Sequence, residues 1–296
     1  MSALTSMFCD LDDFCKGFEP RLEEHLLKTG QTKPRRQPRL ALSEIMTIIV
    51  FFHRSRYRDF KSYYTGFVLK HLRGCFPKAV SYNRFVELMP RALVPLCAYL
   101  AQRKGRTTGI AFIDSCPLAV CHNRRIHAHK VFHGVAARGK TSVGWFYGFK
   151  LHLIVNDRGE ILAVRLTPGN TDDRVPVPDL CEGLWGRLYG DKGYISQVLH
   201  DELFERGVEL VTKLKKNMRE RLIRLWDKLM LRKRALIESV IDQLKNISQV
   251  EHSRHRSVVG FMVNVVAGLV AYTHQEKKPS LGLIRQDGSS LPVALV

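Results

Sequence analysis

The spacing of apolar residues changes near Gly105, and this change restricts the fold more than any other feature of the sequence. Before Gly105, apolar side chains recur every three or four residues along 42–49 and 85–100, which predicts helices. Pro90 and Pro95 lie in the second stretch and are expected to kink or divide it. The part of the chain before Gly105 is therefore predicted to be all-helical.

After Gly105 the apolar residues alternate with polar ones, which is typical of β-strands. Stretches 149–155 and 161–166 flank the turn residues 156–159 and predict a β-hairpin. The other expected elements are strands at 110–114, 187–191 and 209–214, a helix at 196–206, and a long helix carrying Glu238. We therefore expect three parts: a helical region at 1–105, an α/β domain at 106–275 and a tail at 276–296.

A large excess of positive charge accompanies this pattern. The chain has 47 Lys and Arg against 28 Asp and Glu, a net charge of +19, which points to a polyanionic partner such as nucleic acid. The basic stretch 32–39 is predicted to be an arm on the DNA backbone, or a plain linker between helices. Residues 53–61 mix cations with aromatic rings, which suits either a helix-turn-helix-like DNA reader or a solvated helical face.

Cysteine usage and hydropathy indicate the compartment. The seven cysteines are scattered, odd in number and without a CxxC pair, which favours a reducing cytoplasm over a secreted disulfide framework. The N-terminus does not resemble a signal peptide. Residues 258–272 form the most apolar segment, but it is shorter than the ~20 residues of a membrane span and contains Asn264, so it predicts a buried helix. We expect a cytoplasmic, nucleoid-associated protein without a membrane.

Two aspartates stand out by position, because Asp114 and Asp191 each end an apolar strand. In open α/β sheets, ligands bind at this edge. If the strands are neighbours, the two carboxylates would repel each other unless a divalent cation neutralised them. Glu238 is expected to point along the same edge, and three oxygen ligands suit Mg²⁺ in phosphoryl transfer. The alternative is that each aspartate forms a turn or caps a helix.

A group of cysteines and histidines between Cys116 and His133 raises the alternative of a zinc site. Its spacing matches no usual zinc-ligand pair. We interpret the segment instead as a basic loop that brings Arg124, Arg125 and Lys130 near phosphate.

Four stretches of the sequence, taken together and in order, resemble the catalytic core of DDE-type transposases of bacterial insertion sequences. The resemblance is greatest to the insertion-sequence family numbered 982, within the IS4-like clan. The stretches are FIDSCP at 112–117, GWFYGFKLH at 144–152, LTPGNTDD at 166–173 and YGDKGY at 189–194. The resemblance implies a ribonuclease-H-like mixed sheet flanked by helices. It also implies a metal-binding catalytic triad of Asp114, Asp191 and Glu238, holding two Mg²⁺ ions for which Mn²⁺ can substitute.

The helix motif of that clan places Tyr, Arg, Glu and Lys at fixed intervals. Arg234, Glu238 and Lys245 fit it, whereas Leu231 stands at the Tyr position. Arg234 and Lys245 are therefore expected to contact DNA. They lie in the segment 213–256, where thirteen Lys and Arg outnumber five Asp and Glu, and binding there should weaken as salt rises.

Several other residues near these motifs have two interpretations. Asp173 competes with Asp191 as the second acid, but its surroundings favour a turn or a cap. Lys192 and Lys150 are expected to contact DNA, or else to be ordinary surface lysines. His152 either lines the same channel or is a hydrogen-bonded structural residue. Aromatic residues Trp145 and Trp226 could stack on an unpaired base, although their spacing favours the core.

These observations predict a DNA transposase that cuts at the ends of an insertion sequence and joins them to target DNA. Its partners would be double-stranded DNA with terminal inverted repeats, target DNA and a second copy of the chain. One alternative is a structure-selective ribonuclease-H-like nuclease that cuts without joining. The other is a non-catalytic DNA-binding repressor descended from a transposase.

Overall fold

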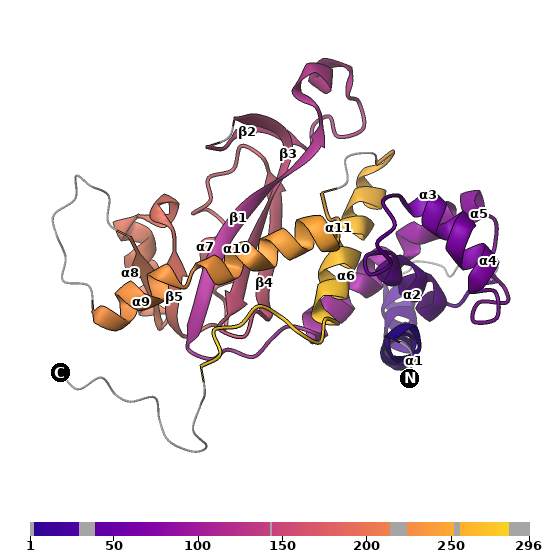
Figure 1. The fold of residues 1–296 in the computed structure, drawn as a ribbon, viewed down its shortest axis with the longest axis horizontal. Coiled ribbons are helices and arrows are strands. Elements are labelled where there is room, and N and C mark those ends of the chain that lie inside the picture. Colours follow the sequence, from indigo (N-terminus) through magenta and orange to yellow (C-terminus); the bar gives the residue numbers. More distant parts are fainter. Residues whose placement is uncertain (1–2, 30–38, 143, 214–223, 252–254, 284–296) are drawn as a thin grey trace.

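The computed structural model describes residues 3–29, 39–142, 144–213, 224–251 and 255–283. Helices make up its N-terminal part, as the spacing predicts, and they gather at one end of the molecule (Figure 1). They are α1 (Ala3–Lys28), α2 (Leu42–Phe52), α3 (Phe60–Tyr63), α4 (Leu69–His71), α5 (Tyr82–Leu88) and α6 (Leu93–Gln102). Pro90 lies in a 3₁₀ turn that separates α5 from α6, so the expected division is confirmed. Most of the predicted arm at 32–39 lies outside the described residues.

The second part of the chain forms one mixed sheet. Its strands are β1 (Ile110–Cys121), β2 (Ala137–Lys140), β3 (Trp145–Asn156), β4 (Ile161–Pro168), β5 (Gly186–Gly190) and β6 (Val208–Thr212). They are ordered β2-β3-β1-β5-β6, with β4 also paired to β3. The β1–β3, β2–β3 and β3–β4 pairs are antiparallel, whereas β1–β5 and β5–β6 are parallel. The predicted hairpin is confirmed as β3–β4, and so is the mixed α/β class.

A tight turn closes this hairpin. Gly159 has a φ of +69°, and a Cβ there would lie 2.1 Å from the carbonyl oxygen of Pro279. The Asn156 side chain accepts hydrogen bonds from the backbone N–H groups of Arg158 and Glu160. The turn residues therefore fix the β3–β4 register, as turn chemistry does in hairpins generally.

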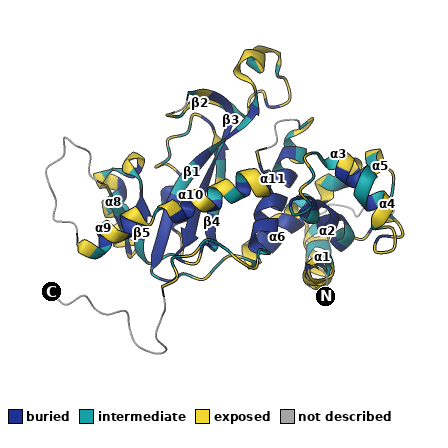
Figure 2. Cartoon of the chain, viewed as in Figure 1, coloured by how far each residue is buried: buried dark blue, intermediate teal, exposed yellow. Residues whose placement is uncertain are grey.

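Helices cover both faces of the sheet, and alternate residues of β1 enter two separate cores. Ala111 and Ile113 pack in a smaller core with the short helix α7 (Val177–Leu180) and with α8 (Gln197–Glu205). Phe112 packs in a larger core on the other face. The larger core contains residues of α9 (Leu225–Arg232), α10 (Ala235–Asp242) and α11 (Val258–Thr273), and it continues into the N-terminal helices. Figure 2 shows the dark buried band running through both parts.

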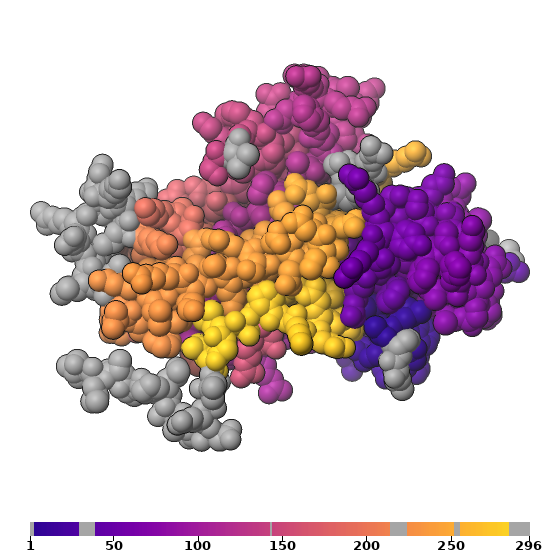
Figure 3. Space-filling view, viewed as in Figure 1, coloured from indigo at the N-terminus to yellow at the C-terminus, as the bar shows by residue number. Residues whose placement is uncertain are grey.

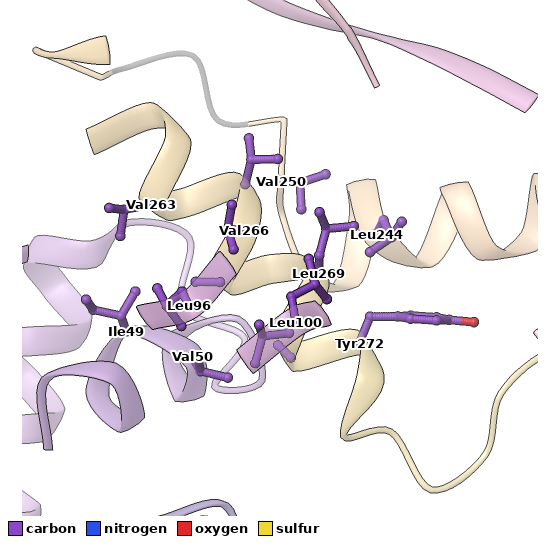
Figure 4. Packing of buried hydrophobic residues seen from close by; sticks show 14 of the residues in the cluster. Ile49, Val50, Leu96, Leu100, Leu244, Val250, Val263, Val266, Leu269 and Tyr272 are labelled. Atoms are coloured by element: carbon purple, nitrogen blue, oxygen red, sulfur yellow. The ribbon is translucent and has the colours of Figure 1, made fainter. Parts of the chain in front are cut away.

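The predicted buried helix at 258–272 is confirmed as α11, which packs against α2 and α6. Its Val263, Val266 and Leu269 lie among the apolar side chains of those helices (Figure 4). Within the described ranges, no helix is long and apolar enough to cross a bilayer. Because α11 follows the sheet in sequence but packs with the N-terminal helices, both parts share one apolar core; the boundaries at 105 and 275 stay a prediction.

The expectation of one long helix around Glu238 is wrong in one respect. That segment consists of α9, then α10, then a π-helical turn at Gln243–Ile247. Helix α9 packs on β5 and β6, whereas α10 packs on β1. Two shorter helices can follow different strands of a twisted sheet, which one straight helix cannot do.

Candidate active site

Asp114 and Asp191 lie at matched positions on neighbouring parallel strands. Phe112 of β1 pairs with Tyr189 of β5, and this is the last pair between the two strands. Asp114 and Asp191 each follow two residues later, at the point where the strands separate. Neighbouring strands lie about 4.8 Å apart, so the register brings the two acids to one edge of the sheet.

The placement of Asp114 differs from the sequence expectation. Asp114 does not end its strand, because β1 continues to Cys121 while paired with β3. Beyond Phe112, β1 has no further pair with β5. The opening between these two strands, rather than the end of β1, therefore gives access to the Asp114 carboxylate, whose side chain is 20% exposed.

Asp191 directly follows β5, as expected, and it also caps the short 3₁₀ helix Lys192–Tyr194. Its Oδ1 accepts a hydrogen bond of 2.7 Å from the Gly193 N–H. A Cβ on Gly193 would lie 2.9 Å from this oxygen, so the glycine leaves room for the carboxylate. The capping interpretation of Asp191 is thus correct for one of its oxygens.

The Asp114 carboxylate is held in a largely buried, negatively charged environment. The pKa of Asp114 is raised from 3.8 to about 6, mainly by burial, and the negative charges of Asp191 and Glu238 act in the same direction. The Arg234 guanidinium and the Ser115 N–H oppose this increase in the pKa. The charges of the other two candidate acids therefore both reach Asp114.

Arg234 connects two of the three acids. Its Nη2 lies 3.2 Å from Oδ2 of Asp114 and 3.3 Å from Oε1 of Glu238. Arg234 precedes α10 and Glu238 lies one helical turn later, so both reach the same edge. The guanidinium stands where a cation shared by these carboxylates would stand. In the part of the chain that the structure describes, no three His, Cys, Asp or Glu side chains converge tightly enough to hold a metal ion.

Asp173 is paired with a different cation. Lys150 Nζ lies 2.9 Å from Oδ1 of Asp173 and donates to the carbonyl oxygen of Thr171 at 2.9 Å. Tyr194 lies nearby; burial raises the pKa of its hydroxyl, and the charges of Asp114, Asp173 and Asp191 add to this increase. Buried Tyr194 thus lies within electrostatic reach of Asp173 and of the two candidate aspartates, Asp114 and Asp191. The YGDKGY stretch contains Tyr194, but sequence reasoning assigned it no place.

The other predicted DNA-binding cations have different surroundings. Lys192 is exposed, directly after Asp191. Lys245 donates to the carbonyl oxygen of Pro117 at 2.8 Å and pairs with Glu251 at 3.0 Å, which ties the helical segment after α10 to β1. Arg234 is engaged with the acids.

His152 and the two tryptophans complete the set of sequence candidates. His152 is fully buried, and burial lowers its pKa to about 4. Its Nε2 forms a 2.8 Å hydrogen bond with Thr167 Oγ1, so the structural interpretation is correct. Trp226 is half-buried against the larger core. Trp145 is 60% exposed, so its expected core role is wrong: β3 begins at this residue, beyond the helices that cover the sheet.

Comparisons with known proteins identify the family of the chain. A cryo-EM structure of the piggyBac transposase synaptic complex with hairpin DNA is similar at 12% identity and a TM-score of 0.45, covering 81% of this chain and 69% of that one. Among curated proteins, no sequence matches this chain. The family described as "Transposase DDE domain" matches residues 104–258, which is just over half of the chain and includes all three candidate acids. This protein therefore belongs to the family of DDE-domain transposases.

Proposed function

We propose that this transposase cuts DNA at the ends of an insertion sequence and joins those ends to target DNA. We also propose that it is a member of insertion-sequence family 982, on the basis of the four sequence stretches given above. The observation that carries the catalytic proposal is the matched register of Asp114 and Asp191, with Glu238 reaching Asp114 through Arg234. These three acids are the proposed catalytic residues.

We propose that Asp114, Asp191 and Glu238 would hold a divalent metal because their carboxylate oxygens suit such an ion, although among the described residues no such group converges tightly enough to hold one in this structure. DDE transposase domains generally use divalent metals, and we propose two Mg²⁺ ions, with Mn²⁺ as a substitute. The raised pKa of Asp114 supports this, because a nearby divalent cation would offset the burial, and to a smaller extent the negative charges, that disfavour its carboxylate. Oxygen ligands also suit Mg²⁺ better than softer metals. When bound, such ions activate the attacking oxygen and stabilise the leaving oxygen in phosphoryl transfer.

The chain's own residues orient this site. The Ser115 N–H donates to Oδ1 of Asp114 at 2.9 Å and fixes the direction of the carboxylate. Lys192 is exposed beside Asp191, where it can neutralise a phosphate next to the scissile bond. Arg234 can transfer from the acids to a DNA phosphate, which is a strong bidentate acceptor for a guanidinium. Lys150 and Lys245 add positive potential while they hold their protein partners.

The proposed partners are two DNA ends with terminal inverted repeats, target DNA and a second copy of the chain. The net charge of +19 supports extensive contact with the DNA backbone. We assign recognition of the repeats to the helical region 1–105. Because two ends must be held together before joining, we expect a homodimer on DNA.

The experiment uses a duplex carrying the DNA that flanks the coding region, with Mg²⁺, and a second assay with pre-cut ends and a target plasmid. Asp114→Asn, Asp191→Asn and Glu238→Gln should each reduce cleavage and joining by at least about 100-fold while leaving DNA binding intact. Asp242→Asn is the matched control, because Asp242 is an exposed acid one turn beyond Glu238 on α10.

Three outcomes would contradict the proposal. Cleavage by Asp114→Asn at the wild-type rate would contradict a catalytic triad that includes Asp114. Cleavage without joining of pre-cut ends would favour the structure-selective nuclease. Binding without cleavage in the wild-type chain would favour the repressor.

A further inference from the structure

A protruding part of the molecule takes no part in the site described above. Among the described residues it comprises 122–142 and 144–145, and it includes the 3₁₀ helix Asn123–Ala128, strand β2 and the first residue of β3. We call it the basic extension. Figures 1 and 3 show it standing out from the body of the molecule beyond the end of β1.

The base of the basic extension is anchored in the larger core. Phe132 is 1% exposed, and its ring lies 5.8 Å from that of Phe149 and 5.4 Å from that of Phe261. The Tyr147 hydroxyl donates to the carbonyl oxygen of Phe132 at 3.2 Å. These contacts hold the extension to the sheet and to α11, so the surface that it presents is preformed.

The charge of the basic extension has one sign only. It contains five Lys and Arg and no Asp or Glu. The five cations are Arg124, Arg125, Lys130, Arg138 and Lys140. All of them are exposed, and none forms an ion pair with another described residue. By contrast, the cations near the acids are mostly paired. A run of unpaired cations is complementary to a polyanion.

A pocket of about 290 Å³ opens in this extension, lined by Asn123, Ile126, Arg138 and Trp145. Trp145 and Ile126 provide apolar walls, and Arg138 provides hydrogen-bond donors. Lys140 Nζ lies 5.7 Å from the centroid of the Trp145 ring, and the Asn123 amide donates to the Trp145 carbonyl oxygen at 2.6 Å. The Asn123 contact fixes the backbone at Trp145 and the Lys140 contact places a cation over the indole, while 60% of the residue is exposed. A held, exposed ring bordered by cations is what base stacking beside a phosphate chain requires.

We propose that this pocket binds one unpaired nucleobase of the DNA, with the neighbouring phosphates on the exposed cations. The proposal deepens the proposed function, and rests on it in taking DNA as the partner. The aromatic wall favours a base over an acidic peptide, because the cations alone would satisfy carboxylates, whereas every base offers a π-face to an indole.

The pocket and the acids are separated along β1, because Asp114 lies within this strand and the pocket residues Asn123 and Ile126 follow its end. Asp114 and Cys121 are seven residues apart, which corresponds to at most roughly 23 Å of extended strand. At about 3.4 Å per nucleotide of B-form DNA, this part of the strand spans at most six or seven nucleotides. The bound base is therefore in a distorted or single-stranded part of the DNA at some distance from the scissile phosphate.

The test measures binding of the full-length chain to labelled DNA in the presence of a chelator, so that no cleavage occurs. The two probes are a fully paired duplex and the same duplex with one bulged thymine. Wild-type protein should prefer the bulged probe by roughly 5- to 100-fold. Trp145→Ala should abolish this preference but keep affinity for the paired duplex, whereas Trp145→Phe should retain most of it.

Trp185→Ala is the matched control, because Trp185 is 57% exposed and lies outside the extension. It should leave the preference unchanged. A second readout uses protein with both Trp185→Phe and Trp226→Phe, in which Trp145 is the one remaining tryptophan. The bulged probe should quench its emission more than the paired probe, because the exposed Trp145 stacks on the base. This measurement does not depend on the folding of a Trp145 variant.

The proposal is overturned if wild-type protein binds both probes equally, or if Trp145→Ala keeps the full preference. It is also overturned if a poly-glutamate peptide binds in a Trp145-dependent way while the bulged probe does not. The outcomes for the two proposals can be told apart. A preference for the bulged probe without Mg²⁺-dependent cleavage would support base binding in the pocket and contradict the proposed transposition chemistry. Cleavage without a preference for the bulged probe would support the chemistry and contradict base binding.

Discussion

The sheet edge that carries Asp114, Asp191 and Glu238 differs from the basic extension in how far its charges are buried and paired. At the edge, Asp114 is largely buried, hydrogen-bonded to Ser115 and paired with Arg234. In the basic extension, five cations are exposed and have no ion-pair partner among the described residues. Buried charges have fixed positions but perturbed pKa values, whereas solvated charges are easily screened by salt. The comparison indicates that a catalytic site needs charges in fixed positions, whereas attraction of a polyanion needs charges that are accessible from solvent.

The largest expected effect is on the free energy of unfolding, which the ionised, buried carboxylate of Asp114 lowers. Because the pKa of Asp114 is raised to about 6, its ionisation destabilises the folded, metal-free protein. Stability from this group is fully present below its unfolded pKa near 4 and is lost as the pH rises through 6. Asp114→Asn should therefore increase the free energy of unfolding by about 2–3 kcal/mol at pH 7 and by almost nothing at pH 4.

Urea unfolding of both proteins with a chelator present, at several pH values, measures this difference. The same difference at pH 4 and pH 7 would mean that the buried carboxylate is not the cause.

The second effect concerns the basic extension and its contribution to DNA affinity. Replacing Arg124, Arg125 and Lys130 by Gln removes three solvated charges, so DNA affinity should fall about 10- to 100-fold at low salt. The slope of log K against log salt should become shallower by about 3. Fluorescence anisotropy over a salt series measures both quantities. Lys28→Gln, which removes an exposed cation paired with Glu24, should leave the slope nearly unchanged.

A third prediction tests whether the charges at the sheet edge are fixed by pairing with Arg234. The Arg234 guanidinium stands between Asp114 and Glu238, where it competes with a metal cation. Arg234→Gln should therefore increase the affinity for Mn²⁺ in the absence of DNA by about 10-fold. Calorimetric titration measures this affinity, with Arg206→Gln as the control because Arg206 follows α8 and pairs with Glu202 rather than with one of the three acids. Unchanged or weaker Mn²⁺ binding by Arg234→Gln would contradict the prediction.

The smallest effect concerns the support of the edge. Lys245→Met removes a hydrogen bond to the Pro117 carbonyl and a partly exposed ion pair with Glu251. The free energy of unfolding should fall by about 1 kcal/mol. Thermal and urea unfolding measure this change. A loss as large as that of a core deletion would show that Lys245 has a role beyond tying this segment to β1.

Local patterns in the sequence account for much of the fold. The β3–β4 hairpin follows from alternation and from turn residues that act within a few positions of each other. The apolar run at 258–272 predicts α11 for the same reason. Strand β2 and the pocket around Trp145 could not be predicted, because the segment that contains them has little periodicity. The continuation of β1 past Asp114 was missed because Pro117 reads as an end to a strand; it is tolerated there on an edge without a β5 partner.

The sequence by itself determined the change from helices to strands at Gly105, the excess of positive charge and the identity of the three candidate acids. Only the tertiary structure decided the matched register of Asp114 and Asp191, the position of Arg234 between two acids and the exposure of Trp145. The reason is physical. Periodicity and turn chemistry act between near neighbours in the chain, whereas parallel pairing and ion pairs join residues 77 or 120 positions apart. Those contacts form only when the whole core packs.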